Sequence, residues 1–194
     1  MYLSRHRAAG GARWALDGHY LPQDFTLGQL LGVRATEIRS FVDGQALGEA
    51  AGDPSLPPVE PGHEIWASGV TYLRSREARE LESTDADAYE RVYDGSCSLG
   101  PGIVLSGSDS MRDLRITMSI RRGGESIFED EIDTSQMKRS PEELAAFLGR
   151  ELAFPRGAFL MTGTGIVPED DFTLGPGDLV RISVGDLVLE NEVA

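Results

Sequence analysis

The chain has 194 residues, of which 40% are hydrophobic and 26% charged, and this composition excludes a disordered tail, a collagen-like repeat and a coiled coil. Its net charge of −14, from 18 basic and 32 acidic residues, argues against nucleic acid as a partner, because nucleic-acid binding needs a basic surface. The sequence has no run of 18 uncharged apolar residues, no secretory signal and a single cysteine, Cys97, so we expect a cytoplasmic protein without a membrane segment or a disulfide framework.

Residues 1–62 are predicted to form a small N-terminal domain. Residues 14–18 (WALDG) and 41–44 (FVDG) each end in Asp-Gly, a pair typical of hairpin turns, and both are interpreted as short strands. Between them, residues 26–31 are predicted to open a short helix. Four prolines lie within residues 53–62 and prevent a helix or a central strand there, so we place a domain boundary in this segment.

Residues 63–194 are assigned to a second, larger domain. The apolar run 64–70 is predicted to be a buried strand. Residues 75–82 (SREARELE) are strong helix formers and predict a helix. The acidic residues that cluster from Glu77 to Glu90 are interpreted as a solvated helix face.

The next elements are predicted from local patterns of apolar residues. Residues 114–121 alternate apolar and polar side chains, which indicates a strand with one buried face. Gly123-Gly124 predicts a tight turn into a hairpin partner at 126–132. Ser140-Pro141-Glu142-Glu143 is typical of a capped helix start, and an apolar stripe carries the predicted helix to residue 152.

The last third of the chain predicts short strands and turns. Residues 158–161 form an apolar strand that leads into the glycine-rich segment 162–165 (TGTG). Residues 175–178 (GPGD) predict a turn, and 179–184 with 187–189 predict a final hairpin. Together, these elements predict an α+β fold that is mostly β.

The segment 162–165 is the most specific candidate for chemistry. A glycine-rich turn after a buried strand can bring backbone N–H groups close to an anion, and the hydroxyls of Thr162 and Thr164 can donate to a carboxylate or keto oxygen. The alternative is a turn in which glycine only supplies a positive φ. The three histidines do not have the spacing of metal ligands, and no nucleophile elbow or nucleotide-binding glycine motif occurs.

Three Glu-x-Glu pairs are further candidates, because two carboxylates on one face of a strand can hold Mg²⁺. They lie at positions 80 and 82, 129 and 131, and 190 and 192. The first pair is expected on a helix, the second on an exposed strand and the third at the C-terminal end. We interpret all three as solvated charge rather than as metal sites.

Several segments, taken in order, resemble the fumarylacetoacetate hydrolase (FAH) superfamily over about residues 64–194. The matching segments are 70–79 (VTYLRSREAR), 92–101 (VYDGSCSLGP), 140–152, 157–164 (GAFLMTGT), 174–178 (LGPGD) and 189–191 (LEN). The first two are most similar to the prokaryotic branch that includes 2-keto-3-deoxy-sugar-acid dehydratases.

The resemblance implies a fold, a cofactor and a substrate class. It implies a mixed β-roll catalytic domain that forms a homodimer, behind the small N-terminal domain. Mg²⁺, or Mn²⁺ or Ca²⁺, would chelate a 2-keto acid and stabilise the enolate formed on cleavage or dehydration. The expected function is therefore metal-dependent dehydration of a 2-keto-3-deoxy sugar acid, or C–C bond hydrolysis, with a small-molecule 2-keto acid as the partner.

Residue roles follow by similarity to the family motifs. Thr162, Gly163 and Thr164 are assigned to substrate binding, because Thr164 or Thr162 matches the family's contact with the substrate carboxylate. Tyr72 is also assigned to substrate binding. The segment that begins at Tyr72 carries the lid and acid/base residues of the family, which makes Arg74, Ser75 and Glu77 the catalytic candidates. Ser75 stands where the common hydrolases have a histidine, which argues against a plain acylpyruvase.

Arg91 and Asp94 complete the set of predicted site residues. Asp94 is a substrate-binding candidate, and Arg91 lies three positions before it, where the family has an active-site lysine. Arginine keeps the positive charge but cannot act as a neutral base, so its catalytic role would be electrostatic.

One departure from the family affects the metal site. In the family, a long stretch lies between the segment that begins at Tyr72 and the segment that contains Arg91 and Asp94, and this stretch supplies the metal carboxylates. Here only residues 78–90 separate the two segments. No metal ligand is therefore assigned, and we interpret the gap as an internal deletion that leaves the catalytic domain incomplete. The alternative function is a catalytically inactive remnant, or a partner subunit of a full-length homologue.

Overall fold

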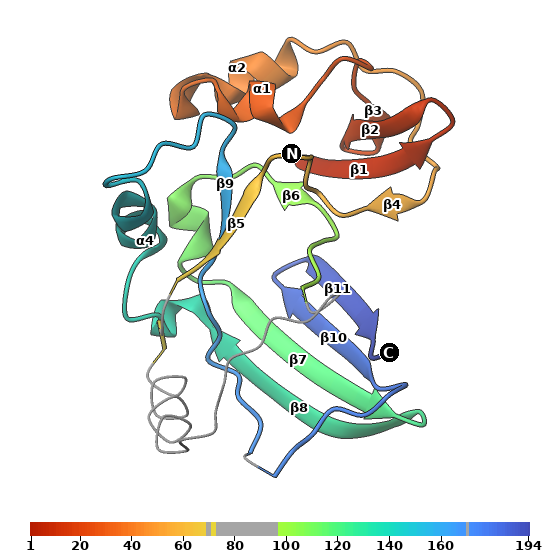
Figure 1. Ribbon diagram of the computed structural model, residues 1–194, viewed down its shortest axis with the longest axis vertical. Helices are drawn as coiled ribbons and strands as arrows, with labels where there is room; N and C mark the ends of the chain where they lie inside the picture. The colour runs from red at the N-terminus through yellow and green to blue at the C-terminus, as the bar shows by residue number, and fades with distance from the viewer. Residues whose placement is uncertain (69–70, 73–96, 170) are drawn as a thin grey trace. The chain divides into compact units, whose positions relative to one another are not determined.

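The computed structural model describes residues 1–68, 71–72, 97–169 and 171–194 (Figure 1). The chain divides into two compact units, which are described separately. Unit 1 comprises Met1–Trp66, Leu99–Ser106 and Leu148–Leu160, and unit 2 comprises Ala67–Ser98, Gly107–Phe147 and Met161–Ala194. The domain boundary placed at residue 62 stays a prediction.

The sheet of unit 1 is built around its first strand. Its strands run in the order β3-β2-β1-β4, and β6 also pairs with β1. Their bounds are β1 Tyr2–Ala8, β2 Gly11–Leu16, β3 His19–Tyr20, β4 Ser55–Leu56 and β6 Ile103–Val104. The predicted Asp-Gly turn after β2 is confirmed: Asp17 and Gly18 both have a positive φ, 46° and 83°, as the tight hairpin turn into β3 requires.

The helices of unit 1 are short: α1 is Leu27–Leu31, the 3-10 helix η1 is Ala35–Glu37 and α2 is Ile38–Asp43. The predicted helix start at Thr26 is confirmed, and Thr26 and Gln29 form a capping box. The prediction of a strand at 41–44 is wrong. Phe41 to Asp43 are helical, because Val42, only 1% exposed, is buried in the hydrophobic core and Gly44 ends the helix.

The core of unit 1 lies between the sheet and these helices. Each of its members is at most 6% exposed: Leu3, Trp14, Leu16, Leu21, Phe25, Leu27, Leu30 and Val42. Strands β1 and β2 contribute Leu3, Trp14 and Leu16 from one face, and α1 contributes Leu27 and Leu30. Burial of these side chains is the main stabilising contribution in this unit, at about 1.5–3 kcal/mol for each large apolar residue.

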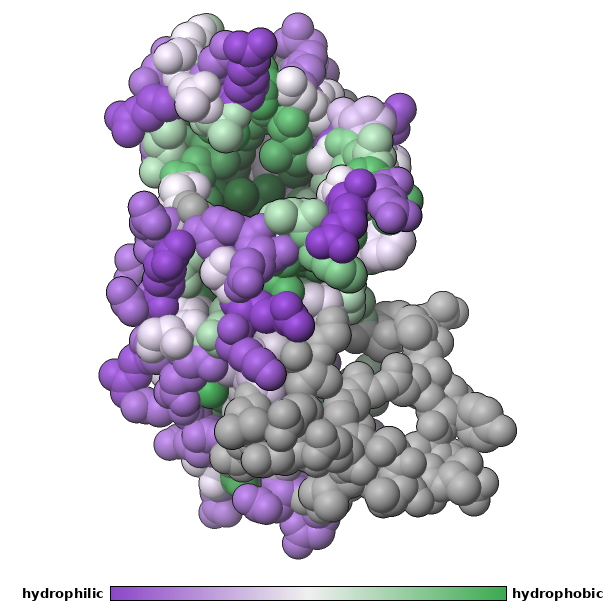
Figure 2. All heavy atoms as spheres, turned by 90° about the vertical axis from the view of Figure 1, so that its left-hand side faces the viewer, coloured by the Kyte–Doolittle hydropathy of each residue, from purple (hydrophilic) through white to green (hydrophobic). Residues whose placement is uncertain are grey.

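Strands β5 (Glu64–Ala67) and β9 (Ala158–Met161) form a two-stranded sheet. The prediction of a strand from residue 64 is confirmed, but the prediction that it is buried is wrong. All four residues of β5 are exposed, including Ile65 at 42% and Trp66 at 38%. Within the described residues β5 pairs only with β9, so no further strand covers it. Figure 2 shows apolar surface gathered on the upper part of the face that it draws.

The sheet of unit 2 has four antiparallel strands in the order β11-β10-β7-β8. Their bounds are β7 Arg115–Arg122, β8 Glu125–Asp133, β10 Leu179–Val184 and β11 Leu187–Glu192. Both predicted hairpins are confirmed, and Gly123 and Gly124 have φ values of 58° and 89° in the turn between β7 and β8. On the apolar face of β7, Ile120 is buried at 2% exposure.

Helix α4, Pro141–Leu148, begins where the sequence predicts. Its capping box is present: Glu143 N donates to Ser140 Oγ over 3.2 Å, and Ser140 N donates to a Glu143 carboxylate oxygen over 2.8 Å. The helix ends four residues before the predicted Leu152, because Gly149 follows and glycine is a poor helix former.

The turn before β10 contains a buried carboxylate. Asp178 is fully buried, and its backbone N–H donates to Gly175 O over 3.1 Å, which confirms the predicted turn. Its carboxylate accepts two hydrogen bonds of 2.7 Å from Arg122 on β7 and one of 2.8 Å from Gly175 N. The turn is thereby fixed to the sheet.

Over the residues that the structure describes, every helix is too short or too polar to cross a membrane.

Candidate functional site

The TGTG turn, residues 162–165, belongs to unit 2 and directly follows Met161, the last residue of β9. Gly163 has a φ of 84°, which a side chain would strain, and both Gly163 and Thr164 are exposed. Thr164 Oγ1 accepts a hydrogen bond from Ile166 N over 3.0 Å, and as a donor it makes only a long bond to Ile166 O, with 3.4 Å between the two oxygens. The turn therefore presents an oriented hydroxyl that can donate to a bound anion.

Three hydrogen bonds from neighbouring residues hold this turn in place. The hydroxyl of Thr71, a residue only 2% exposed, donates to the carbonyl oxygen of Thr162. The residue just before the turn, Met161, is held by Ser68. Ser68 donates twice to Met161 O, from its backbone N at 2.8 Å and from its hydroxyl at 3.0 Å. Lys138 N donates to Thr71 O over 2.9 Å, so the anchoring residue is itself held.

Tyr72 packs directly under the turn. It is 3% exposed, and a Cβ added at Gly165 would lie 2.8 Å from its Cδ1 and would also meet Ile132 Cδ1. Gly165 is therefore required for close packing. Burial, and secondarily the negative charge of Asp133, raises the pKa of the Tyr72 hydroxyl, so this group stays protonated at neutral pH.

The structure brings together four of the predicted site residues: Thr162, Gly163 and Thr164 belong to one anchored turn, and Tyr72 packs against it at Gly165. The other five, Arg74, Ser75, Glu77, Arg91 and Asp94, lie outside the described residues, and their roles stay predictions. Sequence reasoning missed the anchoring residues Ser68 and Thr71. The signal that could have found Thr71 is its position next to Tyr72.

The described residues offer no group of side chains that could hold magnesium. Among them, no three His, Cys, Asp or Glu side chains cluster in a way that could bind a metal ion. Glu131 pairs with Arg115, Glu129 accepts from Ser126 at 2.7 Å, and Glu190 lies 3.2 Å from Arg181. These carboxylates are already paired and do not fit a magnesium ion. The pair at 80 and 82 lies outside the described residues.

A comparison with protein families identifies the class. Residues 67–194 match the family described as fumarylacetoacetate (FAA) hydrolase C-terminal. The chain belongs to this family, which confirms the resemblance that its motifs indicate.

Curated relatives carry more particular names. The chain is 33% identical over 169 residues to the "probable 2-keto-3-deoxyxylonate dehydratase" of Haloferax volcanii, a match that covers 82% of this chain and 58% of that protein. It is 36% identical over 164 residues to the "2-dehydro-3-deoxy-D-arabinonate dehydratase" of Saccharolobus solfataricus, covering 79% and 54%. The matched part is thus somewhat more than half the length of each relative.

Solved structures share the fold. A 2-keto-3-deoxyarabinonate dehydratase in a hexagonal crystal form matches with a TM-score of 0.77 at 22% identity, covering 100% of this chain and 99% of that chain. A second, a 2-keto-3-deoxy-D-arabinonate dehydratase complexed with magnesium and 2,5-dioxopentanoate, matches with a TM-score of 0.67 at 21% identity, covering 99% and 98%. The predicted mostly-β fold of this family is confirmed.

Proposed function

We propose that this chain acts, as part of an FAH-family enzyme, in the dehydration of a 2-keto-3-deoxy sugar acid. The observation that carries the proposal is the anchored TGTG turn, in a chain whose two curated relatives are both named as dehydratases of such acids. Mg²⁺ is part of the proposal, because a solved structure of the same fold is described as complexed with magnesium, and its ligands would have to come from residues other than the described carboxylates. A homodimer and a cytoplasmic location are part of the proposal.

The reaction is balanced without an oxidant or reductant. A five-carbon 2-keto-3-deoxy acid loses one water, as the C4 hydroxyl and a proton from C3, which leaves a C3=C4 double bond. Proton shifts from C5 to C3 and from the C5 hydroxyl to C4 then leave the C5 aldehyde of 2,5-dioxopentanoate. The substrate carboxylate carries a negative charge throughout, so a hydroxyl fixed beside it serves binding and orientation. Thr164 supplies this hydroxyl, and Thr71 and Tyr72 hold the turn that carries it.

The experiment follows substrate loss by proton NMR with 2-keto-3-deoxy-arabinonate and -xylonate, with and without added Mg²⁺. Thr164→Val keeps the side-chain shape but removes a hydrogen bond to a charged group, so we expect kcat/KM to fall about 10–100-fold, mainly through KM. Thr164→Ser should retain activity, and Thr173→Val, at an exposed position on another loop, is the matched control. Equal activity of Thr164→Val and the wild type would refute the assigned role.

A second candidate function is an inactive remnant or a partner subunit of a longer homologue. Two observations favour it: the matched part is little more than half the length of the curated relatives, and the described residues hold no carboxylate cluster. It predicts no turnover of either substrate with or without Mg²⁺, and a stable complex when the chain is co-expressed with a full-length relative. An active homodimer, seen by sedimentation and by assay, would exclude it.

A further inference from the structure

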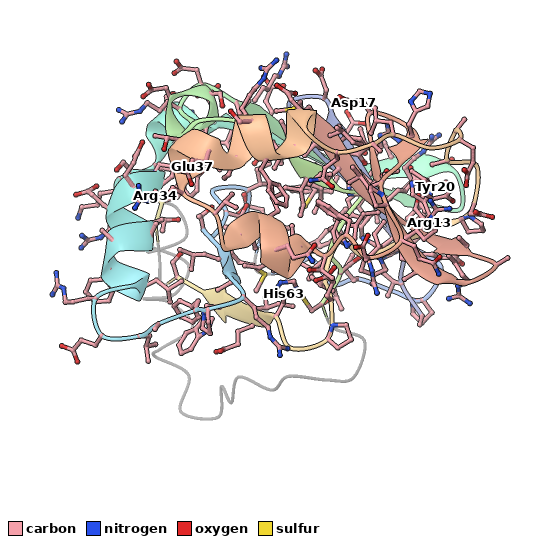
Figure 3. The ribbon with its side chains drawn as sticks, turned by 90° about the horizontal axis from the view of Figure 1, so that it is seen from above. Arg13, Asp17, Tyr20, Arg34, Glu37 and His63 are labelled. Carbon is pink, nitrogen blue, oxygen red and sulfur yellow. The ribbon has the colours of Figure 1, made fainter. Side chains whose placement is uncertain are left out.

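Unit 1 contains a cavity of about 620 Å³ that the proposed dehydration does not use. It lies beside the start of α1 and against strands β1 and β2, and its lining includes Arg5, Trp14, Phe25, His63 and Arg156. Figure 3 shows that His63 lies apart from Arg13 and Tyr20. Those two residues contact each other, and the Arg13 guanidinium carbon is 4.2 Å from the Tyr20 ring centre. The cavity volume is in the range of small-molecule sites.

Arg156 is held in place by its neighbours. Gly62 has a φ of 90°, and a Cβ there would lie 2.6 Å from Arg156 Nη1, so the guanidinium lies directly against the bare backbone. His63 Nδ1 accepts from Glu60 N over 3.0 Å, which leaves the proton on Nε2. Nε2 then donates to Arg156 O over 2.9 Å and fixes the backbone that carries the guanidinium.

The charge of the lining is unbalanced. Glu60 is its one acidic residue, and its carboxylate accepts from Trp14 Nε1 at 2.6 Å and from Leu27 N at 2.9 Å. Arg5, opposite Trp14 in the β1–β2 register, donates to Pro57 O at 3.3 Å. In the described part of the chain, neither Arg5 nor Arg156 has a carboxylate within 4.0 Å, although the protein has 32 acidic residues.

We propose that this cavity binds a small carboxylate with an apolar body. Two arginines without acidic partners suit an anion, and the planar guanidinium matches a carboxylate in a bidentate manner. Trp14, Phe25 and Pro61 line the same cavity and supply apolar contacts. Because phosphate also binds arginine but lacks an apolar part, these walls favour the organic acid.

The test uses the whole 194-residue chain with the substitution Trp66→Phe. Of the two tryptophans, only Trp14 then remains as a fluorescent reporter. Benzoate is titrated by fluorescence and by calorimetry, with benzamide as the neutral isostere and inorganic phosphate as the other anion. Saturable binding of benzoate and no binding of benzamide are expected. In Arg156→Gln and Arg5→Gln, loss of the charged hydrogen bonds should weaken binding about 10-fold or more, whereas Arg39→Gln, 76% exposed on α2, should bind as the parent does.

Circular dichroism and a melting curve establish that each variant folds, and the second arginine variant keeps the test decisive if the first does not. The proposal is overturned if benzoate gives no saturable response at tens of millimolar. It is also overturned if benzamide binds equally well, if phosphate binds and benzoate does not, or if every variant that folds binds benzoate like the parent. None of these readouts depends on catalytic activity, so failure here leaves the proposed dehydration untouched.

Discussion

Arg122 and Asp178 are joined by two hydrogen bonds of 2.7 Å each, although the Arg122 side chain is 52% exposed and the Asp178 side chain is fully buried. With Gly175 N, the guanidinium lowers the pKa of Asp178 from its ordinary 3.8 to about 2. A carboxyl whose pKa is lower in the folded state stabilises the fold above its unfolded pKa. This contribution is complete above about pH 5 and is lost as the pH falls toward 2.

Asp178→Asn removes that charge, so we expect a lower Tm at pH 7 and a flatter dependence of Tm on pH between 5 and 2. The Tm difference between wild type and variant should shrink on acidification. Melting curves across this pH range measure it. The control is Asp109→Asn, because Asp109 has a side chain 96% exposed. A constant Tm difference over the whole range would refute the linkage.

Gly165→Ala tests the packing of the TGTG turn against Tyr72. The added methyl would lie 2.8 Å from Tyr72 Cδ1, and we expect a loss of about 1–3 kcal/mol in stability. For a chain of this size that is roughly 2–12 °C in Tm. Gly107→Ala is the matched control, because nothing lies within 4 Å of its added Cβ and its φ is −77°. Similar melting of both variants would show that Gly165 is not tightly packed.

Ser140→Ala tests the capping box of α4. Loss of the hydroxyl leaves Glu143 N without its side-chain acceptor, and we expect about 0.5–2 kcal/mol less stability. Ser140→Asp should restore most of it, because aspartate caps as well as serine does. Denaturant unfolding followed by circular dichroism is the measurement, with the exposed Ser106→Ala as control. An alanine variant as stable as the aspartate variant would contradict the role.

Glu60→Ala tests the link between the proline-rich segment and the core of unit 1. The carboxylate accepts from Trp14 Nε1 and Leu27 N, and losing charge-assisted bonds of this kind costs about 1.5–3 kcal/mol. Denaturant unfolding measures the loss, and Trp14 fluorescence in a Trp66→Phe background reports whether the indole changes its surroundings. Glu49→Ala, whose carboxylate is 68% exposed, should have a smaller effect. Equal stabilities of the two variants would refute the special position of Glu60.

The elements that were predicted correctly depend on local chemistry. The turn at Asp17-Gly18 and the cap at Ser140 need only residues within four positions, and both are confirmed. The strand predicted at 41–44 failed because the burial of Val42 is decided by residues far along the chain. For the same reason, the sequence could not show that β5 lacks a covering partner among the described residues.

The residues of the candidate turn were predicted from motifs, but the residues that anchor the turn were not. Thr162, Gly163 and Thr164 follow from a recognisable turn, and the structure presents them as one anchored group. The bond from Thr71 to Thr162 joins segments distant in the sequence, so no local pattern reveals it.

The pairing of β1 with β6 bears on how shorter pieces of the protein should be made. Residues 103–104 pair with Tyr2 and Leu3, and Arg156 lies against Gly62. The first strand therefore has a neighbour from the middle of the chain, and the loop between β4 and β5 has one from near its end. A fragment cut after residue 62 would lose both, and would expose backbone amides that the intact chain keeps hidden. Fragments meant to fold alone should therefore include the segments around residues 103 and 156, joined by short linkers or added as separate peptides.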